Sequence, residues 1–75
     1  MSAQVEVIPG TFAARLRELR TARGWSQVTL AARADMSTNH LAYLEWGNGE
    51  PQLYTIRKLA AALGISISQL MEGVE

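Results

Sequence analysis

The chain has 75 residues, a formal net charge of zero and no cysteine, which excludes disulfides and thiolate metal sites. A chain of this length forms one small domain. No run approaches the roughly 18 apolar residues of a membrane span, and residues 1–10 lack the features of a signal peptide. We therefore expect one soluble domain that acts in the cytoplasm.

The charges are distributed unevenly along the chain. Residues 11–34 carry five arginines and one acidic residue, whereas residues 35–75 carry two basic and five acidic residues. A positive face of this kind can steer a protein toward phosphates even when the net charge is zero. The alternative is that these arginines only solvate the first helix.

The first half of the chain predicts three short helices. Thr11 suits the N-cap of a helix that ends near Arg23, Ser26 that of a second helix, and Ser37 that of a third helix that ends at Gly47. Apolar residues recur at helical spacing in these segments. They are Phe12, Leu16 and Leu19, then Val28, Leu30, Ala31 and Ala34, then Leu41 and Leu44.

Tight connections separate these helices. Gly24 suits the left-handed backbone conformation that follows a helix end. Asp35 tolerates the same conformation, so that Asp35 and Met36 can form the turn between the second and third helices. The second and third helices therefore form a compact pair.

The second half of the chain predicts two more helices after a loop at residues 48–51, which contains glycine and proline. A fourth helix covers about Gln52–Leu63, and a capping-box pattern at Ser66–Gln69 opens a short fifth helix. The apolar stripe of the fourth helix is Leu53, Ile56, Leu59, Ala60 and Leu63. The expected architecture is an all-α domain of five helices over residues 11–75, preceded by an N-terminal arm over residues 1–10.

Several fragments of the chain follow one another at a characteristic spacing. They are Leu16-x-x-Leu19-Arg20, Gly24-Trp25-Ser26-Gln27-x-x-Leu30-Ala31, Ser37-x-x-x-Leu41-x-x-Leu44-Glu45-x-Gly47, and Pro51-x-x-x-x-Ile56-x-x-Leu59-Ala60-x-x-Leu63-Gly64-Ile65-Ser66. Together they resemble the Cro/CI (XRE) helix-turn-helix family of prokaryotic and phage regulators. The resemblance implies a lambda-repressor-like fold whose third helix enters the major groove of DNA.

The resemblance also implies which residues contact DNA. Thr38 and Asn39 match the principal base-reading positions, flanked by His40 and Ala42, with Tyr43 one turn further along. An asparagine can pair with adenine through two hydrogen bonds, and a threonine methyl can pack on the thymine methyl. His40 is equally compatible with an ordinary surface position, and Tyr43 with packing on a neighbouring helix.

A second group of residues is expected at the phosphate backbone. The resemblance implies that Gln27 contacts the DNA backbone and also supports the first residue of the third helix. Trp46 could donate its indole N–H to a phosphate or cover the third helix or a partner subunit. The full set of expected backbone contacts is Ser26, Gln27, Ser37, Arg15, Arg33, Trp46 and Asn48.

Two further expectations concern structure rather than contact with DNA. Arg20 and Glu45 match positions that form an internal ion pair in close relatives, and an arginine fork suits a carboxylate. The C-terminal segment has more apolar side chains than a short helix needs, so we expect it to form a homodimer interface. The residues expected there are Ile67, Leu70, Met71 and Val74, and the alternative for Leu70 is that it only completes the core of the monomer.

These observations favour a sequence-specific, double-stranded-DNA-binding transcriptional regulator, a small dimeric repressor or controller with a palindromic operator. The alternative is an antitoxin-type protein that masks a partner protein and regulates its own operon. An enzyme is not expected, because the chain has no paired-carboxylate pattern, no cysteine nucleophile, no glycine-rich phosphate loop and only one histidine. We also expect no cofactor, metal, membrane partner or small-molecule ligand, and a prokaryotic or phage origin.

Overall fold

The computed structural model describes residues 11–47 and 51–74, so the expected N-terminal arm lies outside the described residues. These residues form five helices and no strand, which confirms the all-α class. The helices are α1 (Phe12–Ala22), α2 (Gln27–Arg33), α3 (Thr38–Glu45), α4 (Leu53–Leu63) and α5 (Ile67–Leu70). None of the described helices is long and apolar enough to cross a membrane.

Local capping fixes where most of these helices begin. The predicted hydroxyl residues cap four of them, each accepting a hydrogen bond from the backbone N–H three residues later: Thr11, Ser26, Ser37 and Ser66. Ser66 and Gln69 complete the predicted capping box. Such caps contribute roughly 1 kcal/mol each, because they satisfy backbone donors that the first helical turn leaves unpaired. The exception is α4, whose N-cap residue Gln52 makes no side-chain capping bond.

The turn between α2 and α3 depends on a left-handed residue. Asp35 has φ of 55°, and it is the only described residue other than glycine with a positive φ. The next N–H, that of Met36, donates to the carbonyl oxygen of Ala31 at 2.9 Å. The chain therefore reverses direction after α2, and this turn brings α3 against α2, as the sequence predicted.

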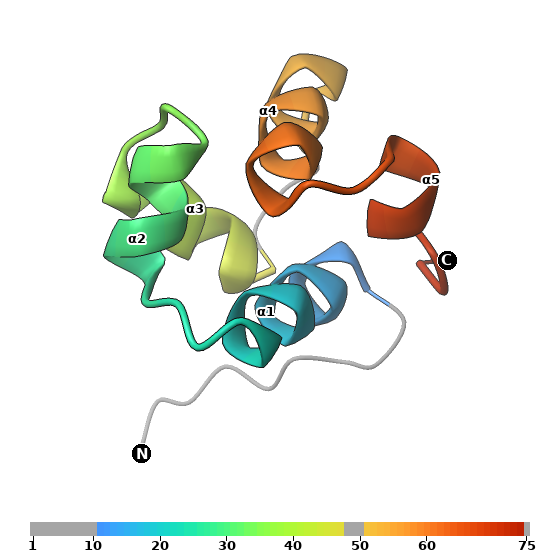
Figure 1. Ribbon diagram of the computed structural model, residues 1–75, viewed down its shortest axis with the longest axis horizontal. Coiled ribbons are helices and arrows are strands. Elements are labelled where there is room, and N and C mark those ends of the chain that lie inside the picture. The colour runs from blue at the N-terminus through green and yellow to red at the C-terminus, as the bar shows by residue number, and fades with distance from the viewer. Residues whose placement is uncertain (1–10, 48–50, 75) are drawn as a thin grey trace.

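One fully buried leucine from each helix forms the centre of the core. The five leucines, with no exposed surface, are Leu16, Leu30, Leu41, Leu59 and Leu70. In Figure 1, α2 and α3 lie together at one end of the long axis, α5 lies at the other end, and α1 and α4 lie between them. The core therefore runs the length of the molecule and holds the α2–α3 pair against the rest.

Two apolar residues are not where the sequence analysis expected them. Leu53, expected on the apolar stripe of the fourth helix, is 55% exposed. Helical periodicity fixes the direction of a side chain, but not whether another element covers it. Leu70, expected in a dimer interface, is instead buried within the monomer.

We predict that Leu70→Ala lowers the free energy of unfolding by about 2–5 kcal/mol, because it opens a cavity in a small core. The matched change Leu53→Ala removes the same atoms from an exposed position, and its effect stays within about 0.5 kcal/mol. Urea denaturation followed by circular dichroism measures both. Equal losses for the two variants would contradict this assignment of the core.

Candidate nucleic-acid interface

Helix α3 has one buried face and one exposed face. Leu41, Leu44 and Glu45 are buried against the rest of the domain. On the opposite face, Asn39 and His40 are exposed, and so is Tyr43 one turn further along, so no neighbouring helix encloses the Tyr43 side chain. The other two predicted base-reading residues, Thr38 and Ala42, are partly exposed. The five predicted base-reading side chains thus lie on a helix whose other face is anchored.

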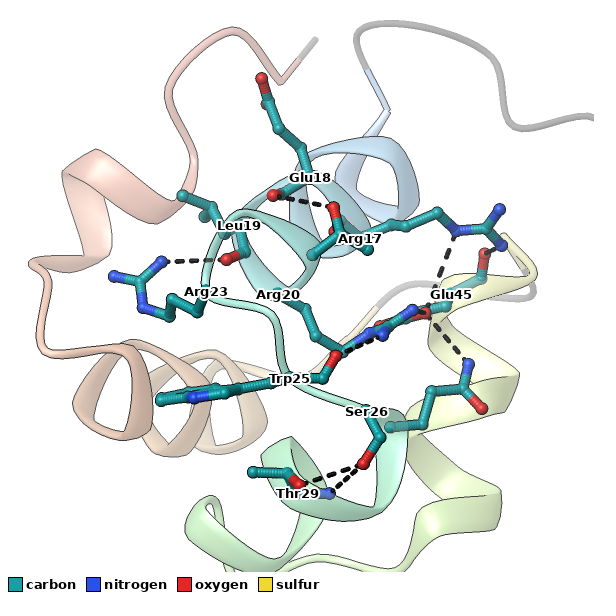
Figure 2. A network of polar contacts seen from close by, with 11 residues as sticks. Arg17, Glu18, Leu19, Arg20, Arg23, Trp25, Ser26, Thr29 and Glu45 are labelled. Carbon is teal, nitrogen blue, oxygen red and sulfur yellow. Dashed lines mark hydrogen bonds and ion pairs between the residues drawn. The ribbon is translucent and has the colours of Figure 1, made fainter.

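The anchor is the buried carboxylate of Glu45, which has no exposed surface. Arg20 donates to it through two parallel hydrogen bonds, Nε to Oε2 at 2.7 Å and Nη2 to Oε1 at 2.9 Å. This confirms the predicted ion pair. Arg20 also donates from Nη1 to the carbonyl oxygen of Trp25 at 2.8 Å, so one guanidinium joins α1, the α1–α2 connection and α3 (Figure 2).

Gln27, the first residue of α2, belongs to the same network. Its Nε2 donates to Oε1 of Glu45 at 3.0 Å. The resemblance placed this side chain against the first residue of the third helix, whereas the structure places it against the last. The hydrogen bond holds the start of α2 to the end of α3, and contact of Gln27 with DNA stays a prediction.

Two arginines expected at the phosphate backbone face other parts of the domain. Arg15 donates from Nη2 to the carbonyl oxygen of Gln69 at 2.6 Å and forms ion pairs with Glu18 and Glu72. Arg15 therefore holds α5 to α1, and its contact with the phosphate backbone stays a prediction. The guanidinium carbon of Arg33 lies 4.5 Å from the centre of the Trp25 ring, a cation–π contact that leaves Arg33 exposed.

The remaining backbone candidates lie near the ends of α2 and α3. Ser26 and Ser37 are exposed, and their hydroxyl oxygens accept the capping hydrogen bonds of the two helices. Trp46 follows the last residue of α3 and is 48% exposed, which leaves its indole accessible to a phosphate or to a partner subunit. Asn48 lies outside the described residues. Their contacts with phosphates stay predictions.

Arg17 is a cationic residue near α3 that the sequence analysis did not single out. Its Nη2 donates to the main-chain oxygen of Glu45 at 3.3 Å, and its side chain is 44% exposed. The available signal is its spacing: Arg17 and Arg20 are three residues apart and share a face of α1. Both side chains point toward Glu45 in Figure 2, while Arg23 points toward α4.

The residues predicted at the dimer interface differ in how exposed they are. Ile67 is 38% exposed at the start of α5, and Met71 and Val74 are partly buried. Met71 packs against the core cluster that contains Leu70. Ile67 is thus the predicted interface residue with the most accessible apolar side chain.

A short helix, a tight turn and a second helix with an outward polar face define the class of helix-turn-helix proteins, here inside a five-helix domain. A family model described as helix-turn-helix matches residues 16–70. The chain belongs to this family, in its XRE-type branch.

Named relatives agree with this assignment. The chain is 44% identical over 61 residues to the HTH-type transcriptional regulator DdrOP3 of Deinococcus deserti, covering 81% of this chain and 47% of the relative. It is 36% identical over 61 residues to the immunity repressor protein of Bacillus phage phi105, covering 81% of this chain and 42% of the relative. The chain thus spans somewhat less than half the length of these two relatives.

One solved structure matches this chain over most of that structure's own length. The restriction-modification controller protein C.AhdI from Aeromonas hydrophila superposes with a TM-score of 0.75 and 44% sequence identity. The match covers 79% of this chain and 89% of the controller protein. This agreement confirms the expected lambda-repressor-like, five-helix fold.

We predict that Glu45→Gln lowers the free energy of unfolding by about 3–5 kcal/mol, because it leaves the Arg20 guanidinium without a charge partner. The same substitution at the exposed Glu18, Glu18→Gln, serves as the control, with an effect within about 0.5 kcal/mol. Denaturant unfolding of both variants measures the difference. A Glu45→Gln variant as stable as the control would show that the buried pair does not hold α3.

Proposed function

We propose that this chain is a sequence-specific, double-stranded-DNA-binding transcriptional regulator whose helix α3 reads base edges in the major groove. The observation that carries the proposal is the pair of faces of α3. Exposed polar groups such as Asn39 and His40 project from a helix that the buried Glu45 network keeps in place. A rigid helix of this kind is the element that helix-turn-helix proteins insert into the major groove.

We further propose that the chain acts as a homodimeric repressor or controller on a palindromic operator. One recognition helix reads too few base pairs for selectivity among many competing sites, and a second copy doubles the site. Ile67 supports an interface at α5, because its apolar side chain is 38% exposed. A two-fold arrangement would place the two α3 helices about one turn of DNA apart.

The proposal extends to the setting of this activity. The named relatives come from a bacterium and a phage, which supports a prokaryotic or phage origin for the chain. We place its action in the cytoplasm, at the nucleoid, with DNA as the ligand and no catalytic role. We propose no cofactor and no small-molecule ligand for this activity.

We predict that Asn39→Ala weakens binding to the preferred duplex by about 1–3 kcal/mol, because it removes a side chain that can pair with a base through two hydrogen bonds. Affinity for an unrelated duplex of equal length stays nearly unchanged. Fluorescence anisotropy at fixed salt, with a preferred duplex selected from a randomised pool, measures both affinities.

The matched control is Gln52→Ala, which removes an exposed amide from the start of α4 and leaves both affinities unchanged. Equal weakening of both duplexes by Asn39→Ala would contradict base reading by this residue. A wild-type chain with no preference for any duplex would contradict the proposed function itself.

We predict that Ile67→Asp gives a monomer in sedimentation velocity, because it buries a charge in the proposed apolar interface. An acidic residue in the first turn of a helix is favourable, so α5 itself is preserved. Val28→Asp, the same type of change at an exposed apolar residue of α2, leaves the dimer intact. A persistent Ile67→Asp dimer would place the interface elsewhere.

A further inference from the structure

The arginines of α1 and of its C-cap, Arg23, differ in how many of their donors are used within the domain. Arg20 donates three hydrogen bonds of 2.9 Å or less. Arg23 donates to the carbonyl oxygens of Leu19 at 3.0 Å and Leu63 at 2.7 Å. Arg15 is only 20% exposed and donates to the end of α5. These three guanidinium groups mainly hold the domain together.

Arg17 is the exception among them. Its one hydrogen bond in the described structure, to the Glu45 main-chain oxygen, is 3.3 Å long. Its Nε lies 4.0 Å from Oε1 of Glu45, too far for a hydrogen bond, and has no other hydrogen-bond partner among the described residues. With 44% of its side chain exposed, Arg17 retains donors for an external ligand.

The charges around Glu45 do not balance. Two guanidinium groups, those of Arg17 and Arg20, lie beside one carboxylate. Arg20 already satisfies that carboxylate through two short hydrogen bonds, and Gln27 adds a third. The excess positive charge therefore resides on Arg17, the more exposed of the two arginines.

The position of this charge identifies the ligand that it suits. Arg17 contacts the last residue of α3, next to the half-exposed Trp46, and shares Oε1 of Glu45 with the first residue of α2, Gln27. It thus lies where the end of α3 meets the start of α2, at the C-terminal end of the helix that carries the proposed reading face. A backbone running past α3 would bring phosphates to this edge, and arginine is a preferred phosphate donor.

We propose that Arg17 binds a phosphate of the DNA backbone at the C-terminal end of α3. This inference rests on the proposed function and adds Arg17 to the expected contacts with the DNA backbone. Binding requires no new fold, because the guanidinium is already held beside α3. The Arg17 contact would fix the register of α3 along the groove without reading any base.

The test compares the salt dependence of binding for Arg17→Gln, Arg17→Lys and the control Arg57→Gln. Arg57 is an exposed arginine of α4, so its variant removes the same charge elsewhere. Each variant is titrated with the selected duplex and with an unrelated duplex between low and moderate salt. Loss of one phosphate contact reduces the slope of log affinity against log salt by about one.

We expect Arg17→Gln to show this reduced slope and to weaken both duplexes by the same factor. Arg17→Lys and Arg57→Gln should keep the wild-type slope. An unchanged slope for Arg17→Gln, an equal reduction for Arg57→Gln, or a reduced slope for Arg17→Lys would each overturn the inference. If the wild type binds no duplex, the proposed function fails; if it binds and only the Arg17 results disagree, this inference alone fails.

Discussion

The structure depends on a single carboxylate that has been removed from water. Glu45 lies at the end of α3, and its oxygens accept hydrogen bonds from Arg20 of α1 and Gln27 of α2. A buried charge is costly unless it is fully paired, so these three helices have one favourable relative position. This constraint also fixes the orientation of the exposed face of α3. Side chains such as Asn39 therefore project from a helix that is held in one position.

The small core explains why polar contacts have so large a structural role here. Each helix contributes one fully buried leucine, and α5 is only four residues long. Arg15 of α1 and Arg23, the C-cap of α1, supplement this limited apolar contact by donating to carbonyl oxygens at the ends of α5 and α4. Hydrogen bonds to charged donors contribute more than those between neutral groups. The positive charge of residues 11–34 is thus largely structural.

Patterns among neighbouring residues predicted the fold well. The contacts of the site residues depend instead on residues that are far apart in the chain. The caps at Ser26 and Ser37 and the left-handed Asp35 follow from a few neighbouring residues, so the sequence predicted them. The partner of each α1 arginine depends instead on which helix packs beside it, a fact that periodicity does not contain. The hydrogen bond of Arg15 to α5 was therefore not predicted, and the Arg20–Glu45 pair was predicted only through resemblance. Periodicity likewise did not show that Leu53 is left uncovered by the other helices.

The chain has two tryptophans, and the fold places them in different surroundings. Trp25 is partly buried, with guanidinium groups at 4.5 Å and 5.7 Å from its ring centre. The side chain of Trp46, at the end of α3, is half-exposed. The indole fluorescence of the unlabelled protein therefore has an internal source and a surface source. Aqueous quenchers would reach the surface source first, so that changes at the end of α3 can be separated optically from unfolding.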